Sequence, residues 1–123
     1  MTQNGQNDKV DKVYDLEERT FIFARDIREF VRSLPRTISA LEDVKQLVRS
    51  SGSVGANYIE ANESLSKKDF VMRVKICRKE AKESEYWIRL LLEINETVDK
   101  VEGVRLLQEA GELKKIFSAI VNK

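Results

Sequence analysis

A heptad-like repeat runs without interruption from Phe70 to Leu91 and predicts a helix from about Lys67 to Glu96. Apolar or small side chains recur in it at alternating spacings of four and three residues: Phe70, Val74, Cys77, Ala81, Ser84, Ile88 and Leu91. This spacing places them on one face of an α-helix. At 1.5 Å per residue the helix would be about 45 Å long. A helix with such a face must bury it against other elements, so the repeat favours a helical bundle.

The segments at the two ends of the chain show amphipathic spacing as well. The first predicts a helix from about Tyr14 to Ser33, which Pro35 terminates because the residue before a proline avoids the α region. Its apolar stripe is Leu16, Phe23, Ile27, Phe30 and Leu34, widened by Phe21, Ala24 and Val31. The last helix should begin after Asp99, which has N-cap spacing to Glu102. Its stripe is Val104, Leu107, Ala110, Leu113 or Lys114, Phe117 and Ile120, flanked by Leu106, Ile116 and Val121.

The second predicted helix contains two glycines. Ser39 and Glu42 have capping-box spacing, so we expect this helix to begin at Ser39 and to end near Asn62. Its predicted face is Leu41, Val44, Val48, Ser51, Gly55, Tyr58 and Asn62, with Leu47, Val54 and Ile59 beside it. Each glycine costs about 1 kcal/mol relative to alanine. The apolar period continues through them, which favours an unbroken helix over a loop that starts at Gly52.

Small side chains also suggest how the second and third helices pack. The narrow middle of the third helix, Cys77 to Ser84, should face the Gly- and Ser-rich stretch of the second, where backbones can approach closely. Ser66 and Asp69 supply a cap signal between these helices. Four amphipathic segments joined by short links predict an all-α, antiparallel up-down-up-down four-helix bundle over residues 13–123. Residues 1–12 are polar and aperiodic, and we expect them to be disordered.

Composition narrows the function. The chain has 123 residues, enough for one domain, with one cysteine and no histidine. Catalytic triads and metal sites that need histidine are therefore excluded. No apolar run is long enough for a membrane span, and the N-terminus lacks the apolar core of a signal peptide. We expect a cytoplasmic protein without membrane contact, without cofactor or bound metal, and without enzymatic activity.

Six basic residues gather on one side of the third predicted helix. Counted at 100° per residue, Lys68, Lys75, Arg78, Lys79, Lys82 and Arg89 fall within an arc of about 100° that also contains Tyr86. Such a row can neutralise successive phosphates, and Tyr86, Trp87 or Tyr58 could stack on bases. The formal net charge is only +1, so any nucleic-acid binding must depend on this local cluster. The alternatives are a solvated helix face, contact with an acidic protein, and aromatics that only pack.

Acidic pairs offer a different interpretation. Glu60 and Glu63, and likewise Glu80 and Glu83, are three residues apart and project from one helix face. A carboxylate magnesium site of the kind found in all-α nucleotide pyrophosphohydrolases could use such pairs. The alternative is that the acids pair with Arg49, Arg73 or lysines on neighbouring helices. Cys77 lies in the apolar repeat and is predicted to be a small core residue.

Two long stretches resemble a known family. Residues 46–64 read QLVRSSGSVGANYIEANES and residues 67–93 read KKDFVMRVKICRKEAKESEYWIRLLLE. With YDLEERTFIFARDI near the start and EAGELKKIF near the end, they make nearly the whole chain from Tyr14 similar to the four-helix-bundle proteins of bacterial 23S rRNA intervening sequences. No residue of that family is assigned a catalytic role, so the resemblance implies none in this chain.

The resemblance also implies an assembly. A related protein, the accessory protein of diversity-generating retroelements, is a homopentamer that binds nucleic acid and a reverse transcriptase. In this chain a second apolar flank on the third helix, formed by Ile76, Trp87, Leu90 and Ile94, favours self-association. The sequence therefore suggests a homo-oligomeric scaffold, with RNA or a nucleic-acid-binding protein as partner. A protein-interaction module without a nucleic-acid role is the main alternative.

Overall fold

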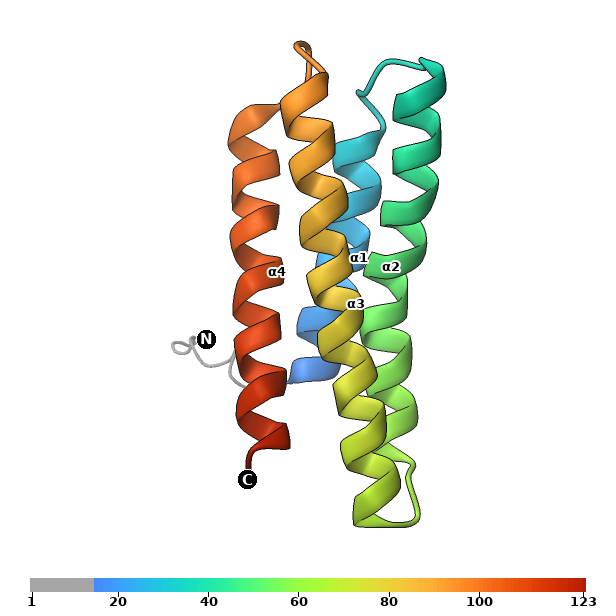
Figure 1. Cartoon of the computed structure of the whole chain (residues 1–123), viewed down its shortest axis with the longest axis vertical. Coiled ribbons are helices and arrows are strands. Elements are labelled where there is room, and N and C mark those ends of the chain that lie inside the picture. Colours follow the sequence, from blue (N-terminus) through green and yellow to red (C-terminus); the bar gives the residue numbers. More distant parts are fainter. Residues whose placement is uncertain (1–14) are drawn as a thin grey trace, which may run out of the picture.

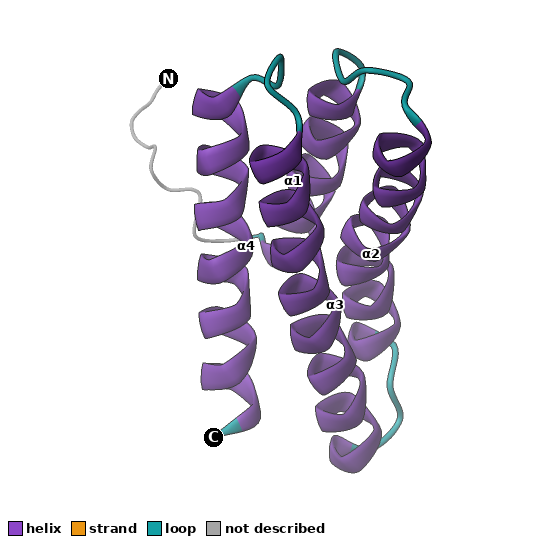
Figure 2. Ribbon diagram, turned by 45° about the horizontal axis from the view of Figure 1, so that its top comes forward, coloured by secondary structure: helices purple, strands orange, loops and turns teal. Residues whose placement is uncertain are grey.

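The computed structural model describes residues 15–123 as four antiparallel helices connected up-down-up-down (Figure 1). They are α1 (Leu16–Val31), α2 (Ile38–Asn62), α3 (Lys67–Ile94) and α4 (Lys100–Val121). The α1–α2 and α3–α4 turns lie at one end of the bundle and the α2–α3 turn at the other (Figure 2). The predicted fold class is confirmed, while the segment 1–12, expected to be disordered, lies outside the described residues.

A side chain caps the start of each helix. Asp15, Ser66 and Asp99 accept hydrogen bonds from the backbone N–H three residues ahead, at 3.2, 3.1 and 3.1 Å. These bonds satisfy donors that have no partner inside the helix. Two of the caps, Ser66 and Asp99, are the ones that the sequence predicts.

Three predicted boundaries need correction. At the start of α2 the cap is Thr37, whose Oγ1 accepts from the N–H of Ala40 at 3.2 Å, so that Ser39 lies within the first turn. Helix α1 ends at Val31 and α3 at Ile94, each two residues earlier than expected. After α3, the side chain of Asn95 donates to the carbonyl of Leu91 at 3.0 Å and so occupies a helix-terminal acceptor.

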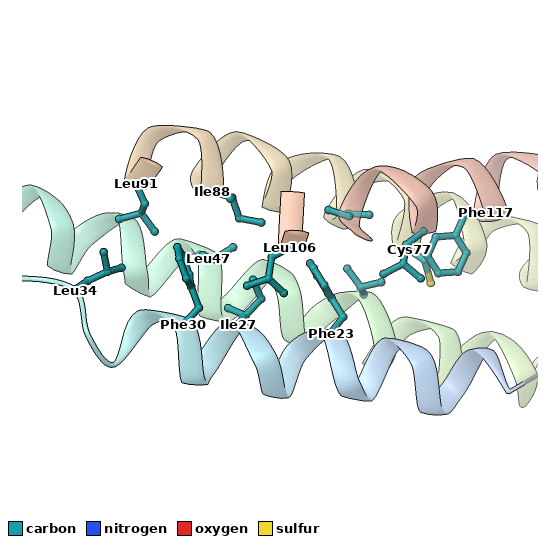
Figure 3. Close-up of a cluster of buried hydrophobic side chains, with 14 of the residues drawn as sticks. Phe23, Ile27, Phe30, Leu34, Leu47, Cys77, Ile88, Leu91, Leu106 and Phe117 are labelled. Carbon is teal, nitrogen blue, oxygen red and sulfur yellow. The ribbon is translucent and has the colours of Figure 1, made fainter. Parts of the chain in front are cut away.

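The core is continuous along the bundle and draws on all four helices (Figure 3). The α3 stripe is buried as predicted from Val74 to Leu91, and Phe70 is partly buried against it. Phe23, Ile27 and Phe30 project from α1 toward Leu106 of α4 and Leu47 of α2 (Figure 3). Burial of these side chains supplies the main favourable free energy of folding.

Helix α2 is unbroken through both glycines, as predicted. A Cβ added at Gly55 would lie 2.8 Å from Oγ1 of Thr20, so this glycine permits close approach of α1. A Cβ at Gly52 would lie 3.1 Å from the guanidinium of Arg28, also on α1. The expectation that the glycines face α3 is therefore wrong. The small residue that does meet α3 is Ser50, whose Oγ lies 2.9 Å from Oγ of Ser84.

Two predicted apolar faces are rotated relative to the observed ones. On α2 the fully buried residues are Leu47 and Val54, whereas Leu41 is 39% exposed and Asn62 is exposed. The reason is that α2 packs against both α1 and α3, which shifts its buried arc toward Ala40, Ser50 and Ala61. On α4 the predicted stripe residues Ala110, Leu113 and Phe117 are buried, but Val104 is exposed, and Gly103 and Leu106 are buried in the first half of the helix. On α1, Phe21 is exposed.

We predict opposite effects of alanine at the two α2 glycines. Gly55→Ala forces a methyl group onto the fully buried Thr20 and should lower the free energy of unfolding by about 1 kcal/mol, since overpacking outweighs the gain in helix propensity. Gly52→Ala, the matched control, meets only the end of the exposed Arg28 side chain and should be neutral or stabilising by up to about 1 kcal/mol. Urea denaturation measures both. Equal stabilisation by the two substitutions would contradict the close α1–α2 contact at Gly55.

Candidate nucleic-acid interface

An open basic groove of about 680 Å³ runs between α3 and α4. Four of the six predicted residues line it, and α4 contributes two further lysines and a serine: Lys75, Arg78, Lys79, Lys82, Lys114, Lys115 and Ser118. The antiparallel arrangement causes this, because the last two turns of α4 lie beside the first half of α3. We call this surface the basic groove.

Two adjoining hollows extend the row of cations along α3. Toward the α3 C-terminus, a hollow of about 570 Å³ contains Tyr86 and Arg89 and shares Lys79 and Lys82 with the basic groove. Toward the N-terminus, a hollow of about 500 Å³ contains Lys68 and shares Lys75. All six residues of the predicted face thus lie along one continuous surface.

The cations of the predicted face form no close ion pairs with other described residues. Among residues 15–123, none of its six basic side chains lies within ion-pair distance of an acid. The two α4 lysines are different, since Lys114 pairs with Glu85 at 2.7 Å and Lys115 with Glu112 at 3.6 Å. The groove therefore carries a local excess of positive charge in a chain that is nearly neutral as a whole.

Lys114 and Lys115 are the functional candidates that sequence reasoning missed. The apolar spacing of the last helix offers Lys114 only as an alternative to Leu113 on the stripe. Leu113 is fully buried, so the next two residues, Lys114 and Lys115, point away from the core and line the groove beside α3. The sequence feature that could have revealed them is the antiparallel order of α3 and α4. This order brings a lysine pair near the end of the chain beside Lys75 and Arg78.

Of the two acidic pairs, Glu80 and Glu83 have a cationic protein partner, whereas Glu60 and Glu63 form no ion pair with another residue of the described range. Arg49 of α2 binds Glu80 at 3.4 Å and also binds Glu83, as the ion-pair alternative predicts. Arg73, by contrast, donates to the side-chain oxygen of Asn57 at 3.1 Å. Within the part of the chain that the structure describes, no group of three or more acidic or cysteine side chains is placed to hold a metal ion.

Glu83 links Arg49 to the aromatic residues of α3. Indole Nε1 of Trp87 donates to Oε2 of Glu83 at 3.1 Å. Partial burial raises the pKa of the Glu83 carboxyl, but the hydrogen bonds from Trp87 and Arg49 outweigh it, so the pKa lies below its ordinary value. The ring of Tyr86 packs edge-on against Trp87 with centroids 4.9 Å apart.

The three aromatic residues considered for base stacking differ in exposure. Tyr58 packs on Phe117 in the core, with centroids 6.0 Å apart, and burial raises the pKa of its phenol. Trp87 is partly buried, whereas Tyr86 is 55% exposed. Only Tyr86 combines an accessible ring with a place in the row of cations.

The remaining predicted features have the following positions. Cys77 is fully buried, as expected for a core residue, and burial raises the pKa of its thiol to about 12. On the second apolar flank of α3, Ile76, Trp87 and Leu90 are half-buried, while Ile94 is 59% exposed. No helix among residues 15–123 combines the length and apolarity needed to cross a membrane.

Comparison with known proteins agrees with this architecture. The model of the 23S rRNA-intervening sequence protein family matches residues 12–119. The chain belongs to this family. A crystal structure of a protein of unknown function from the S23 ribosomal protein family of Bacteroides thetaiotaomicron superposes with a TM-score of 0.79 at 28% identity, covering 89% of this chain and all of the other. No curated protein is significantly similar.

We predict that Arg49→Ala destabilises this family member by about 1–2 kcal/mol at neutral pH, because two carboxylates, one of them buried, lose their cation. The pKa of Glu83 is depressed in the folded state, so its contribution to stability is present above its ordinary value of 4.5. That contribution disappears as the pH falls through the folded-state pKa. The difference between wild type and variant should therefore shrink below pH 4.5.

Urea denaturation across a pH series provides the measurement. The matched control is Arg32→Ala, which removes an exposed pair with Glu29 and should change stability by less than about 0.5 kcal/mol. If Arg49→Ala matched this control, or if its deficit grew in acid, the assigned role of Arg49 would be wrong.

Proposed function

We propose that this protein is a non-enzymatic, self-associating bundle of the cytoplasm that binds RNA through the basic groove. The observation that carries the proposal is the convergence of Lys75, Arg78, Lys79 and Lys82 with the two lysines of α4 along one open surface. Among the described residues, the four α3 cations of this cluster form no ion pair with an acid, whereas the two α4 lysines each have an acidic partner. Unpaired cations attract a polyanion, and each phosphate that they neutralise releases counterions.

The shape of the groove fits a nucleic-acid backbone better than a small anion. Its cations are spread over several turns of α3 and continue into both adjoining hollows, instead of converging on one point. Lysine and arginine side chains at successive turns can reach successive phosphates.

Self-association is the second part of the proposal. Three apolar side chains are exposed near the α2–α3 end of the bundle: Ile59 of α2 (50% exposed), Leu65 of the turn (99%) and Met72 of α3 (55%). Exposed apolar residues of this size favour association. The resemblance to the retroelement accessory protein supports a homopentamer as the assembly.

An acidic protein is the second candidate partner. The net charge of +1 favours it, because this charge provides little long-range attraction for a nucleic acid. An acidic peptide would use the same lysines, but it would not display the counterion-release behaviour of a phosphate backbone.

We predict salt-dependent binding of an RNA hairpin that depends on the groove. If the four α3 cations of the groove each meet a phosphate, log Kd should change with log salt with a slope of about 3, or roughly 50-fold between 50 and 200 mM salt. The triple charge reversal Lys75→Glu, Lys79→Glu, Lys82→Glu should weaken binding at least about tenfold and reduce the slope. Fluorescence anisotropy of labelled RNA measures both quantities.

The matched control reverses three exposed cations at the other end of the bundle, with Arg36→Glu, Lys45→Glu and Lys100→Glu. Both variants have the same net charge, so any difference between their RNA affinities reports on the position of the charges. If RNA binds at the basic groove, the control variant should keep the wild-type affinity to within about twofold. Light scattering on the same samples gives the mass, and a multiple of 14.2 kDa supports self-association. Absence of salt-dependent binding, or equal loss in both variants, would refute the proposed function, and the mass of a single chain would refute self-association.

A further inference from the structure

The surface around Tyr86 suggests which form of RNA the groove accepts. Tyr86 lies in the hollow that continues the basic groove toward the α3 C-terminus, with Lys82 one turn before it and Arg89 one turn after it. The ring is 55% exposed, and Leu107 of α4 lies on the same surface. An accessible aromatic ring between two cations matches a base flanked by its two phosphates.

Both carboxylates in this hollow are paired with cations of neighbouring helices. Glu83 is held by Arg49 and by the indole of Trp87, and Glu85 is held by Lys114 at 2.7 Å. In the described chain, Lys79, Lys82 and Arg89 have no such acidic partner. Phosphates approaching the hollow therefore meet cations that are free to bind them.

The position of the ring is fixed by contacts that extend to a second helix. Arg49 of α2 holds Glu83, Glu83 accepts from Trp87, and the rings of Trp87 and Tyr86 pack at an interplanar angle of 78°. A ring held this way loses little conformational freedom when a base stacks on it. More than half of the Tyr86 side chain stays exposed beside Trp87. Packing within the bundle therefore does not explain why an aromatic ring stands at this position.

We propose that Tyr86 is a base-stacking platform and that the groove therefore binds an unpaired RNA strand in preference to a duplex. This inference rests on the proposed function and adds the class of RNA to it. Within an A-form duplex both faces of a base are covered by its neighbours, whereas an unpaired base can stack on an aromatic side chain. Lys82 and Arg89 then bind the phosphates on either side of that base.

The experiment compares Tyr86→Ala and Tyr86→Phe on two probes. Oligouridine is the single strand, and its duplex with oligoadenine covers the faces of its bases by stacking and adds a second charged strand, so each variant is compared with the wild type on the same probe. Tyr86→Ala should weaken oligouridine binding about fivefold or more and leave duplex binding unchanged, because loss of one stacked base affects only the single strand. Tyr86→Phe keeps the ring and should bind both probes as wild type does.

A second readout comes from Trp87, the one tryptophan of the chain. A base that stacks on Tyr86 lies beside this indole, so oligouridine should change its emission in the wild type and much less in Tyr86→Ala. Wild-type oligouridine affinity in Tyr86→Ala would overturn the stacking inference, and so would equal losses on both probes. The proposed function would survive either result as long as the groove charge reversal still weakened duplex binding. If neither probe bound with salt dependence, the proposed function itself would fail.

Discussion

The burial of the α3 stripe determines how the rest of the molecule is arranged. Because side chains on a helix are separated by 100°, fixing Val74, Cys77, Ala81 and Ile88 in the core fixes the direction of every other residue on α3. The narrow middle of the stripe lets α2 approach until the hydroxyls of Ser50 and Ser84 meet at 2.9 Å. One hydroxyl donates to the other, and each also lies within hydrogen-bond distance of a carbonyl of its own helix, so neither buried group is left unpaired.

The candidate interface follows from that rotation. With the stripe inward, the cations of α3 face outward beside α4, and the antiparallel return of the chain adds Lys114 and Lys115 to the same surface. On the opposite flank, Arg49 of α2 holds Glu80 and Glu83 and thereby Trp87. The same packing that stabilises the fold thus gathers charge on one surface and supports the aromatic residue next to it.

Much of the fold could be predicted from the sequence, because helix formation and burial depend on local spacing. Local spacing correctly predicted the α3 stripe, the caps at Ser66 and Asp99, and the continuity of α2. Local spacing did not predict which face of α2 is buried, because α2 packs against two helices at once. This packing leaves Leu41 exposed and buries Leu47. For the same reason the sequence could not show that Gly55 accommodates Thr20 of α1 rather than α3.

For the interface, sequence spacing located the residues of one helix but not those of its neighbour. All six predicted cations lie on the continuous surface. Lys114 and Lys115 could not be added from the sequence, because this requires knowing how α3 and α4 are aligned along the bundle axis. The exposure of Tyr86 and the burial of Tyr58 also depend on neighbouring helices, because both tyrosines occupy helical positions that spacing alone leaves undecided.

The most direct test of the account is an NMR titration of the ¹⁵N-labelled protein with a single-stranded RNA. Amides of α3 from Lys75 to Arg89 and of α4 near Lys114 should shift as RNA is added, while those on the outer faces of α1 and α2 should stay in place. Shifts concentrated on α1 and α2, or no shifts at RNA concentrations that saturate binding, would contradict the assignment of the α3–α4 groove as the RNA-binding surface.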